Sequence, residues 1–169
     1  MKRLMAPWRS GYVTGASGGD ECVLCEIGAR EEMDRENFVL HRDGGIYVVL
    51  NRYPYINGHM MVVPGRHVAD LSGLEEEELS TMVRLLVRCE KALVEGMNCM
   101  GINGGWNIGG CAGAGIEGHV HIHILPRWLG DTNFLTTVGE TRVLSMSLEE
   151  SYARLAPFFD GDGGGNVGG

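Results

Sequence analysis

Short apolar runs bounded by turn formers recur along the chain, and this pattern predicts β-strands. Residues 38–41 and 46–50 are separated by the turn formers of residues 42–45, so we expect the two stretches to form a hairpin. A third strand is predicted over residues 59–64, where a proline ends the strand because it has no N–H to donate to a neighbour. The pattern therefore predicts a sheet that begins in the first half of the chain.

A different period marks the helices. Between Ser72 and Gly96, apolar residues recur at spacings of three and four, which is typical of a helix with one apolar face. We expect Ser72 to cap the start of this helix and Gly96 to stop it after about Glu95. The predicted apolar stripe consists of Leu79, Met82, Val83, Leu86, Cys89 and Leu93. Shorter helices are predicted over residues 22–30 and 148–158.

Glycine-rich sequence precedes the last predicted strand. Residues 101–109 fit a strand loosened by glycine, residues 109–115 a glycine-rich turn, and residues 118–128 a further strand. The strands and the long helix follow one another without a regular strand–helix–strand alternation. This order indicates an α+β fold in which one long helix packs on a mainly antiparallel sheet of about five strands.

Three histidines alternate with aliphatic residues in the last predicted strand. Positions i, i+2 and i+4 of a strand point to one face, so His119, His121 and His123 are expected to form a row. The opposite face, toward the core, would receive Val120, Ile122 and Ile124. Neutral imidazoles need hydrogen-bond partners and charged ones repel each other, so such a row fits a site that handles protons, phosphates or a metal.

Composition narrows the classes of function. The chain has 169 residues, of which 44% are apolar and 21% are charged, and these values fit one domain with a proper core. The net charge is −8 and there is no basic patch, which argues against sequence-independent binding to a nucleic acid backbone. A phosphorylated small molecule can still bind where histidines and backbone donors surround it.

The two ends of the chain are expected to lie outside the domain. Residues 1–21 are predicted to be irregular, residues 22–159 to form the domain, and residues 160–169 to be a flexible glycine-rich tail. The first residues carry positive charge but are not followed by an apolar run, so we expect neither a signal peptide nor a membrane helix. The expected location of the protein is therefore the cytoplasm. The tail lacks the glutamate of a calcium loop.

The five cysteines are unevenly spaced and are expected to be reduced. Cys22 and Cys25 form a Cys-x-x-Cys motif, which has two interpretations: a redox pair or half of a zinc site. A thioredoxin-like pair would follow a strand, whereas this one follows a glycine-rich segment. Cys89 is predicted to be a core residue of the long helix.

The sequence His-Val-His-Ile-His-Ile-Leu at residues 119–125 resembles the motif of the histidine triad family. Residues 51–64 resemble the family's segment upstream of its triad. Residues 126–128 and 130–134 are similar to the branch that contains bacterial diadenosine tetraphosphate phosphorylases, also called ATP adenylyltransferases. The resemblance covers about residues 22–158 and implies the family's fold and a homodimer, with no organic cofactor.

The resemblance also implies nucleotidyl transfer at an α-phosphate. His121 would be the nucleophile, kept neutral and oriented by the backbone carbonyl of His119, while His123 would donate to the phosphate. Backbone N–H groups of the glycine turn would approach the phosphate closely, namely those of Gly113, Ala114 and Gly115. Further implied substrate contacts come from Asn51 at the ribose, Asn107 at the phosphate, Val49 and Met61 at the base, and Trp128.

A structural zinc is implied by the same resemblance. In related bacterial proteins an early Cys-x-x-Cys joins two histidines, and the matching positions are Cys22, Cys25, His67 and His119. Two thiolates and two imidazoles make a complete tetrahedral ligand set. His59 matches a family position near the site, and a purely structural, hydrogen-bonded histidine is an equal interpretation.

Three hypotheses on function follow. The first is phosphorolysis of diadenosine tetraphosphate to ADP and ATP through a nucleotidyl-His121 intermediate, with hydrolysis of dinucleoside polyphosphates or nucleoside phosphoramidates as its alternative. The acceptor is inorganic phosphate in one case and water in the other. The second is a binding module without catalysis, which would need no nucleophile. The third is a zinc-dependent redox or regulatory protein that acts through Cys22 and Cys25.

Overall fold

The computed structural model describes residues 22–139 and 143–160. The predicted irregular segment 1–21 and residues 161–169 of the predicted tail lie outside the described residues. The described part is built on one antiparallel sheet of five strands in the order β1-β2-β3-β5-β4. The strands are β1 (Val39–Asp43), β2 (Ile46–Leu50), β3 (Met60–Pro64), β4 (Gly101–Gly105) and β5 (Ile122–Arg127). The predicted α+β class with a mainly antiparallel sheet is confirmed.

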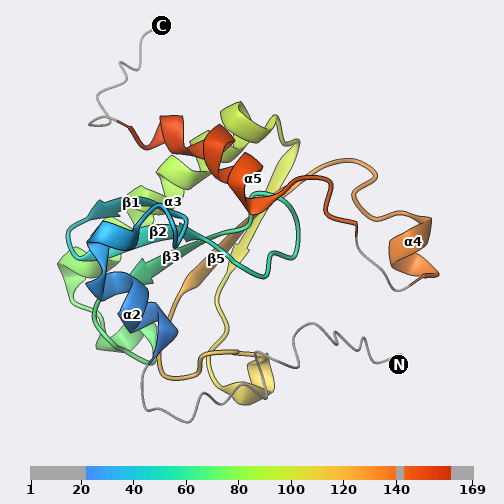
Figure 1. Cartoon of the computed structure of the whole chain (residues 1–169). Helices are drawn as coiled ribbons and strands as arrows, with labels where there is room; N and C mark the ends of the chain where they lie inside the picture. The colour runs from blue at the N-terminus through green and yellow to red at the C-terminus, as the bar shows by residue number, and fades with distance from the viewer. Residues whose placement is uncertain (1–21, 140–142, 161–169) are drawn as a thin grey trace, which may run out of the picture.

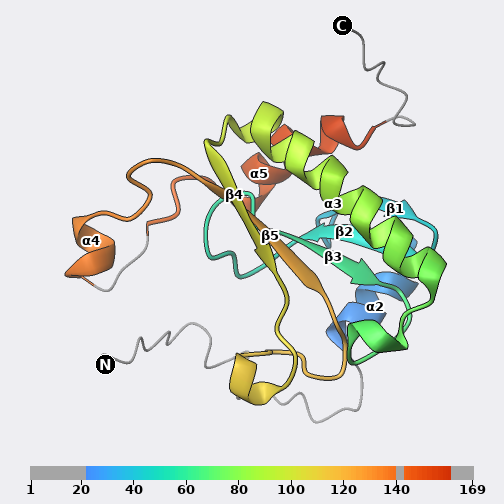
Figure 2. The ribbon, with the colours of Figure 1, turned by 180° about the vertical axis from the view of Figure 1, so that it is seen from behind.

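The long helix α3 (Glu76–Met97) lies across one face of the sheet, and Figure 2 shows this side. The helix α5 (Leu148–Leu155) and the 3-10 turn η5 (Ala156–Phe158) pack beside it. Apolar side chains from β2, β3 and β5 meet these helices in the main core, which includes Ile46, Val48, Met60, Val62, Ile122, Ile124, Leu85, Cys89, Leu93 and Leu155. The core position predicted for Cys89 is confirmed.

Both predicted ends of α3 are wrong. Glu75, not Ser72, is the N-cap, because Glu75 and Glu78 form a reciprocal capping box while Ser72 lies in a preceding 3-10 turn, η3 (Leu71–Gly73). Gly96 lies inside the helix, which ends at Met97 and is capped by Asn98 in the left-handed conformation. A Cβ on Gly96 would lie 2.7 Å from Cε2 of Phe158, so this glycine allows η5 to approach the helix.

The predicted apolar stripe of α3 is partly wrong. Leu79 and Val83 are 37% and 59% exposed, whereas Leu85 is buried at 3%. The whole buried row is Thr81, Met82, Leu85, Cys89, Ala92, Leu93 and Met97. Two overlapping apolar rows run along this helix at similar spacings. Which row is buried depends on how the helix packs on the sheet, and the sequence pattern does not contain this information.

The opposite face of the sheet carries α2 (Val23–Ala29), which Figure 1 shows on the side away from α3. A smaller core beneath it contains Leu24, Val39, Tyr47, Val49 and Val63. The remaining short elements are η2 (Glu31–Met33), η4 (Gly110–Ala112) and α4 (Phe134–Thr137), and α4 stands apart from the sheet in both views (Figures 1 and 2). No helix among the described residues is long and apolar enough to span a membrane.

The predicted histidine strand is shorter than expected. β5 begins at Ile122, so His119 and His121 precede the first ladder pair and only His123 lies within the strand. The alternation of faces is nevertheless confirmed, because the three aliphatic residues between and after the histidines belong to the main core: Val120, Ile122 and Ile124. The histidines therefore lie on the face of the sheet that α3 does not cover.

Candidate active site and metal centre

A cleft lies over β3 and β5 on the face opposite α3. The loop after β2 forms one wall, and the glycine-rich segment after β4 forms the other. Its empty volume is about 450 Å³, including the part that is open to solvent. The residues that line it are Asn51, Tyr53, Tyr55, Met61, Asn107, Gly113, Gly115, Ile116, His121 and His123. None of these side chains carries a permanent charge, so an anion in the cleft would meet neutral hydrogen-bond donors.

The hydrogen bond of His121 fixes its tautomer. Nδ1 of His121 lies 2.9 Å from the backbone carbonyl oxygen of His119. A carbonyl can only accept, so Nδ1 carries the proton and Nε2 keeps a lone pair. The ring is 8% exposed, and burial lowers the pKa of His121 below its usual value. A neutral imidazole with a free nitrogen is the form that can attack an electrophile.

A second chain of hydrogen bonds fixes the tautomer of His123. The backbone N–H of Tyr55 donates to Nδ1 of His59 over 3.2 Å, so this nitrogen carries no proton. Nε2 of His59 must then carry one, and it donates to Nδ1 of His123 over 2.9 Å. The proton of neutral His123 is consequently on Nε2. His123 can therefore donate a hydrogen bond, whereas His121 offers a lone pair.

The loop after β2 is held in place by the same groups. Oδ1 of Asn51 accepts the backbone N–H of Tyr53 over 2.9 Å, as in an Asx-turn, and Nδ2 of Asn51 lies 3.4 Å from Nδ1 of His59. The ring of Tyr55 lies with its centroid 4.7 Å from that of His59 and 6.0 Å from that of His123. His59 is 1% exposed and thus forms a buried link between the loop and His123 on β5.

The glycine-rich wall has a backbone that other residues rarely adopt. Gly109 and Gly113 have φ angles of +79° and +86°, on either side of the turn η4. These left-handed conformations favour glycine because other L-residues meet a steric penalty there. Gly113 and Gly115 bring backbone close to the cleft without a side chain, which is the property expected of a phosphate cradle.

The four predicted metal ligands lie together around His119, the first histidine of the row. The ligand atoms of Cys22, Cys25, His67 and His119 are all within 4.8 Å of one another. Sγ of Cys25 lies 3.2 Å from Nδ1 of His67 and 3.4 Å from Nδ1 of His119, and Sγ of Cys22 lies 3.4 Å from the latter nitrogen. In tetrahedral zinc with Zn–S of about 2.3 Å and Zn–N of about 2.0 Å, sulfur and nitrogen are about 3.5 Å apart. The spacing therefore fits a zinc ion.

The protonation of His119 also fits a metal ligand. Its Nε2 donates to the carbonyl oxygen of Pro64 over 2.7 Å, so the lone pair is on Nδ1, on the side of the cysteines. Burial lowers the pKa of His119, and burial together with the neighbouring Cys22 raises the pKa of the Cys25 thiol. A Cβ on Gly118 would lie 3.0 Å from Nε2 of His67, so this glycine leaves room for the His67 ring beside the cluster.

Comparison with known proteins identifies the family. A model of the HIT domain matches residues 32–128. The AP-4-A phosphorylase of Mycobacterium tuberculosis is 33% identical over 164 residues, which span 92% of this chain and 83% of the relative. The chain belongs to the HIT domain family. A HIT-like protein of Methanocaldococcus jannaschii is 31% identical over 114 residues, covering 65% of this chain and 81% of that protein.

Solved structures agree with this membership of the HIT family. A zinc-bound histidine triad family protein from Mycobacterium smegmatis superimposes with a TM-score of 0.66 at 27% identity, covering 82% of this chain and 93% of that one. A HIT family protein from Bacillus anthracis gives a TM-score of 0.57 at 26% identity, covering 64% and 74%. The spacing of the Cys/His cluster is compatible with zinc, and one structurally similar HIT protein is zinc-bound.

The cleft of this HIT domain does not contain all the predicted site residues. Val49 is 1% exposed in the small core beneath α2, and Trp128 packs against the main core with Nε1 donating to the carbonyl of Asn98 over 3.1 Å. Ala114 and His119 do not line the cleft either. The cleft residues that the sequence analysis did not single out are Tyr53, Tyr55 and Ile116. Tyr53 and Tyr55 lie within residues 51–64, and the resemblance of that segment to the family was the available clue.

Proposed function

We propose that this protein is a nucleotidyl transferase of the HIT type, which cleaves diadenosine tetraphosphate or a related dinucleoside polyphosphate by phosphorolysis. The observation that carries the proposal is the hydrogen bond from Nδ1 of His121 to the carbonyl of His119 over 2.9 Å. It leaves Nε2 unprotonated in a cleft that offers neutral donors. The name of the relative from Mycobacterium tuberculosis supports phosphorolysis as the overall reaction.

In the proposed first step, Nε2 of His121 attacks the α-phosphorus and forms a P–N bond. The bond from this phosphorus to the bridging oxygen breaks, and diadenosine tetraphosphate loses ATP. In the second step an oxygen of inorganic phosphate attacks the same phosphorus, the P–N bond breaks, and ADP leaves. Covalent catalysis of this kind divides one difficult displacement into two easier ones.

The other cleft residues are proposed to bind the reacting phosphate. Nε2–H of His123 and the side chain amide of Asn107 would donate to its oxygens, together with backbone N–H groups of Gly113 and Gly115. Each preorganised donor of this type is worth about 10²–10³ in rate in comparable sites. Met61 and Ile116 would contact the base. Asn51 would contact the ribose, because its Oδ1 accepts one hydrogen bond in the Asx-turn and can accept a second.

The experiment that tests the reaction supplies diadenosine tetraphosphate with and without inorganic phosphate and identifies products by mass. We expect ADP and ATP in equal amounts, formed only when phosphate is present. AMP and ATP formed without phosphate would instead identify a hydrolase. His121→Asn should abolish turnover, and His41→Asn is the matched control because His41 contacts Arg88 and does not line the cleft.

We also infer a structural zinc held by Cys22, Cys25, His67 and His119. The distances between their ligand atoms support it, as does the lone pair that His119 directs at the cysteines. The ion would tie α2 to the segment that carries His121, and its chemistry would be to cross-link rather than to react. Elemental analysis of the purified protein should find one zinc per chain, and no zinc, even after incubation with the ion, would refute the assignment.

A homodimer is the third part of the proposal. β4 lies at the edge of the sheet, and Met100, Trp106 and Ile108 near it are 67%, 51% and 42% exposed. An edge strand with exposed apolar neighbours is suited to pair with a second chain. Light scattering should give twice the mass of one chain, and the mass of a monomer at micromolar concentration would contradict the proposal.

A further inference from the structure

The two cysteines of the Cys/His cluster lie one helical turn apart at the start of α2. Cys22 is the N-cap of this helix and Cys25 is in its first turn. Both thiols are partly exposed, and their Sγ atoms lie within 4.8 Å of each other. A disulfide needs the Cα atoms to be about 4.4–6.8 Å apart, a range that includes residues one turn apart on a helix. The two sulfurs are therefore close enough, at the first turn of one helix, to be candidates for a disulfide.

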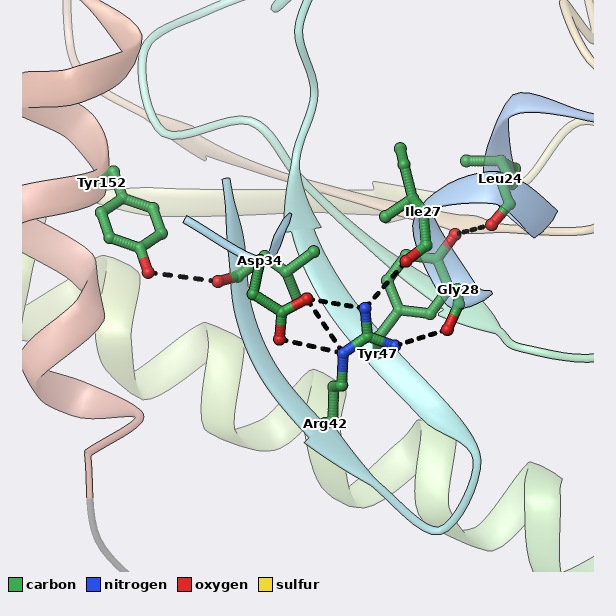
Figure 3. Close-up of polar contacts among 8 residues, drawn as sticks. Leu24, Ile27, Gly28, Asp34, Arg42, Tyr47 and Tyr152 are labelled. Atoms are coloured by element: carbon green, nitrogen blue, oxygen red, sulfur yellow. Dashed lines mark hydrogen bonds and ion pairs between the residues drawn. The ribbon is translucent and has the colours of Figure 1, made fainter. Parts of the chain in front are cut away.

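The helix that carries these cysteines is anchored to the sheet independently of the metal ligands (Figure 3). The guanidinium of Arg42 donates to the carbonyl oxygens of Gly28 and Ile27 over 2.9 and 2.8 Å, and it pairs with Asp34 at 2.7 Å. These contacts hold the C-terminal end of α2. None of the three partners of Arg42 is a residue of the Cys/His cluster.

Tyr47 gives α2 a second anchor. Its hydroxyl donates to the carbonyl oxygen of Leu24 over 2.7 Å, and the ring is 1% exposed beneath the helix. Figure 3 shows Tyr47 and Arg42 reaching α2 from two neighbouring strands. Because both anchors would survive the loss of a metal, the two thiols would stay side by side after it leaves. The histidines of the cluster come from other segments, so they would separate from α2 more easily than the cysteines separate from each other.

We propose that Cys22 and Cys25 are a site of reversible oxidation, at which a peroxide converts the metal-bound dithiolate into a disulfide and expels the metal. This inference rests on the proposed zinc site but not on the proposed nucleotidyl transfer. In its chemistry it is a modification site with hydrogen peroxide or an organic peroxide as oxidant. Its consequence is that the cross-link between α2 and His119, two residues before His121, depends on the redox state.

The electrons and atoms of the oxidation balance as follows. One thiolate attacks a peroxide oxygen, the O–O bond breaks, and a sulfenic acid and hydroxide form. The second thiolate attacks the sulfenic sulfur, the S–S bond forms, and a second hydroxide leaves. Two sulfurs thus give two electrons to one peroxide, and zinc is released because a disulfide is no longer an anionic ligand. A small thiol returns the two electrons and restores the dithiolate.

The structure also predicts what survives the oxidation. Nε2 of His119 still donates to the carbonyl of Pro64, and both anchors of α2 are untouched. We therefore expect the oxidised protein to remain folded, with a lower midpoint of thermal unfolding because the stabilisation from bound metal is lost. A folded, metal-free and reducible form distinguishes a built oxidation site from general oxidative damage.

The test uses the full-length, zinc-loaded protein. It is titrated with hydrogen peroxide while a chromophoric chelator reports free zinc, and peptide masses are measured in parallel. We expect one zinc released per chain, a loss of two hydrogens confined to the peptide with Cys22 and Cys25, and recovery of both zinc binding and mass after dithiothreitol. Far-ultraviolet circular dichroism should stay unchanged throughout.

Variants at the other thiols are the matched controls. Cys99→Ser and Cys111→Ser should release zinc as the wild type does, because neither residue belongs to the cluster. Zinc that stays bound while peroxide is consumed would overturn the proposal, and so would a disulfide that involves Cys99 or Cys111. A chain that never binds zinc would refute the metal assignment as well. No outcome depends on nucleotide turnover, so the two proposals fail separately.

Discussion

At the scale of single residues, the protonation of three histidines follows from groups that can only donate or only accept. The carbonyls of His119 and Pro64 place protons on Nδ1 of His121 and Nε2 of His119, and the amide of Tyr55 fixes His59. The sequence pattern predicted the histidine row, and the family resemblance singled out its central member. The sequence could not assign a role to His59. Its contact with His123, which is 64 residues away in the sequence, depends on how β3 pairs with β5.

The link from His59 to His123 leads to the first prediction. His59→Phe keeps a ring against Tyr55 but removes the donor to Nδ1 of His123, so His123 loses the tautomer that donates to the phosphate. We expect kcat to fall about 10–100-fold with little change in KM. Steady-state kinetics on diadenosine tetraphosphate measures this effect. An unchanged kcat with a lower thermal midpoint would show that His59 is only structural.

At the scale of elements, the sequence placed most strands and the short helices α2 and α5, but it missed both ends of α3 and made β4 and β5 too long. β2 was placed correctly because its apolar run lies between clear turn formers. The start of α3 was wrong because Ser72 and Glu75 both offer a cap, and only the reciprocal bonds between Glu75 and Glu78 decide between them. The end was wrong because Gly96 serves the packing of Phe158 rather than a helix stop. Such choices depend on tertiary contacts that no local pattern contains.

The capping box of α3 predicts a pH-dependent stability. Glu78 accepts hydrogen bonds from Arg66 over 2.6 Å and from the backbone N–H of Glu75 over 2.8 Å. The bond from Arg66 lowers the pKa of Glu78 most, and the backbone bond and the positive charge of Arg66 lower it further. A lowered pKa stabilises the fold above the unfolded value of about 4.3, and this contribution is lost as the pH falls through the folded value. Glu78→Gln should therefore lower the midpoint of thermal unfolding at pH 7 and have a smaller effect at pH 3. Equal effects at both pH values would contradict this account.

The contact between Gly96 and Phe158 gives a second prediction at this scale. Alanine favours a helix over glycine by about 1 kcal/mol, so Gly96→Ala would stabilise an isolated helix. Here the new Cβ would lie 2.7 Å from Cε2 of Phe158 and 3.2 Å from the carbonyl of Arg154, and we expect a net destabilisation of about 1–3 kcal/mol. Denaturant unfolding measures it. Adding Phe158→Leu should restore part of the loss, and a stabilised single variant would refute the packing argument.

At the scale of the whole molecule, the two faces of the five-stranded sheet differ: one packs against the main core, and the other carries the candidate site. α3 and α5 cover the first, while α2, the Cys/His cluster and the cleft occupy the second. His119 belongs to both parts of the second face, because its ring contacts the cysteines and its carbonyl orients His121. A metal at the cluster would thus help to hold His121, the proposed nucleophile, in its orientation.

Removal of that metal is the prediction at this scale. Cys22→Ser takes one thiolate from the cluster while leaving the anchors of α2 in place. We expect loss of stoichiometric zinc and a midpoint of thermal unfolding lower by about 5 °C, with nucleotidyl transfer reduced less than tenfold. Zinc analysis, calorimetry and kinetics on one preparation test all three. A complete loss of turnover in a folded variant would instead assign the metal a catalytic role.

His121 is proposed to carry the nucleotidyl group during the reaction, and this intermediate can be trapped. The protein is mixed with diadenosine tetraphosphate in the absence of phosphate, quenched within the first turnovers, and digested for peptide mass analysis under conditions that preserve phosphoramidates. We expect one adenylyl group on His121, which disappears as ADP forms when inorganic phosphate is added before the quench. Turnover to ADP and ATP by a His121→Gly variant, or an adenylyl group on another residue, would contradict it.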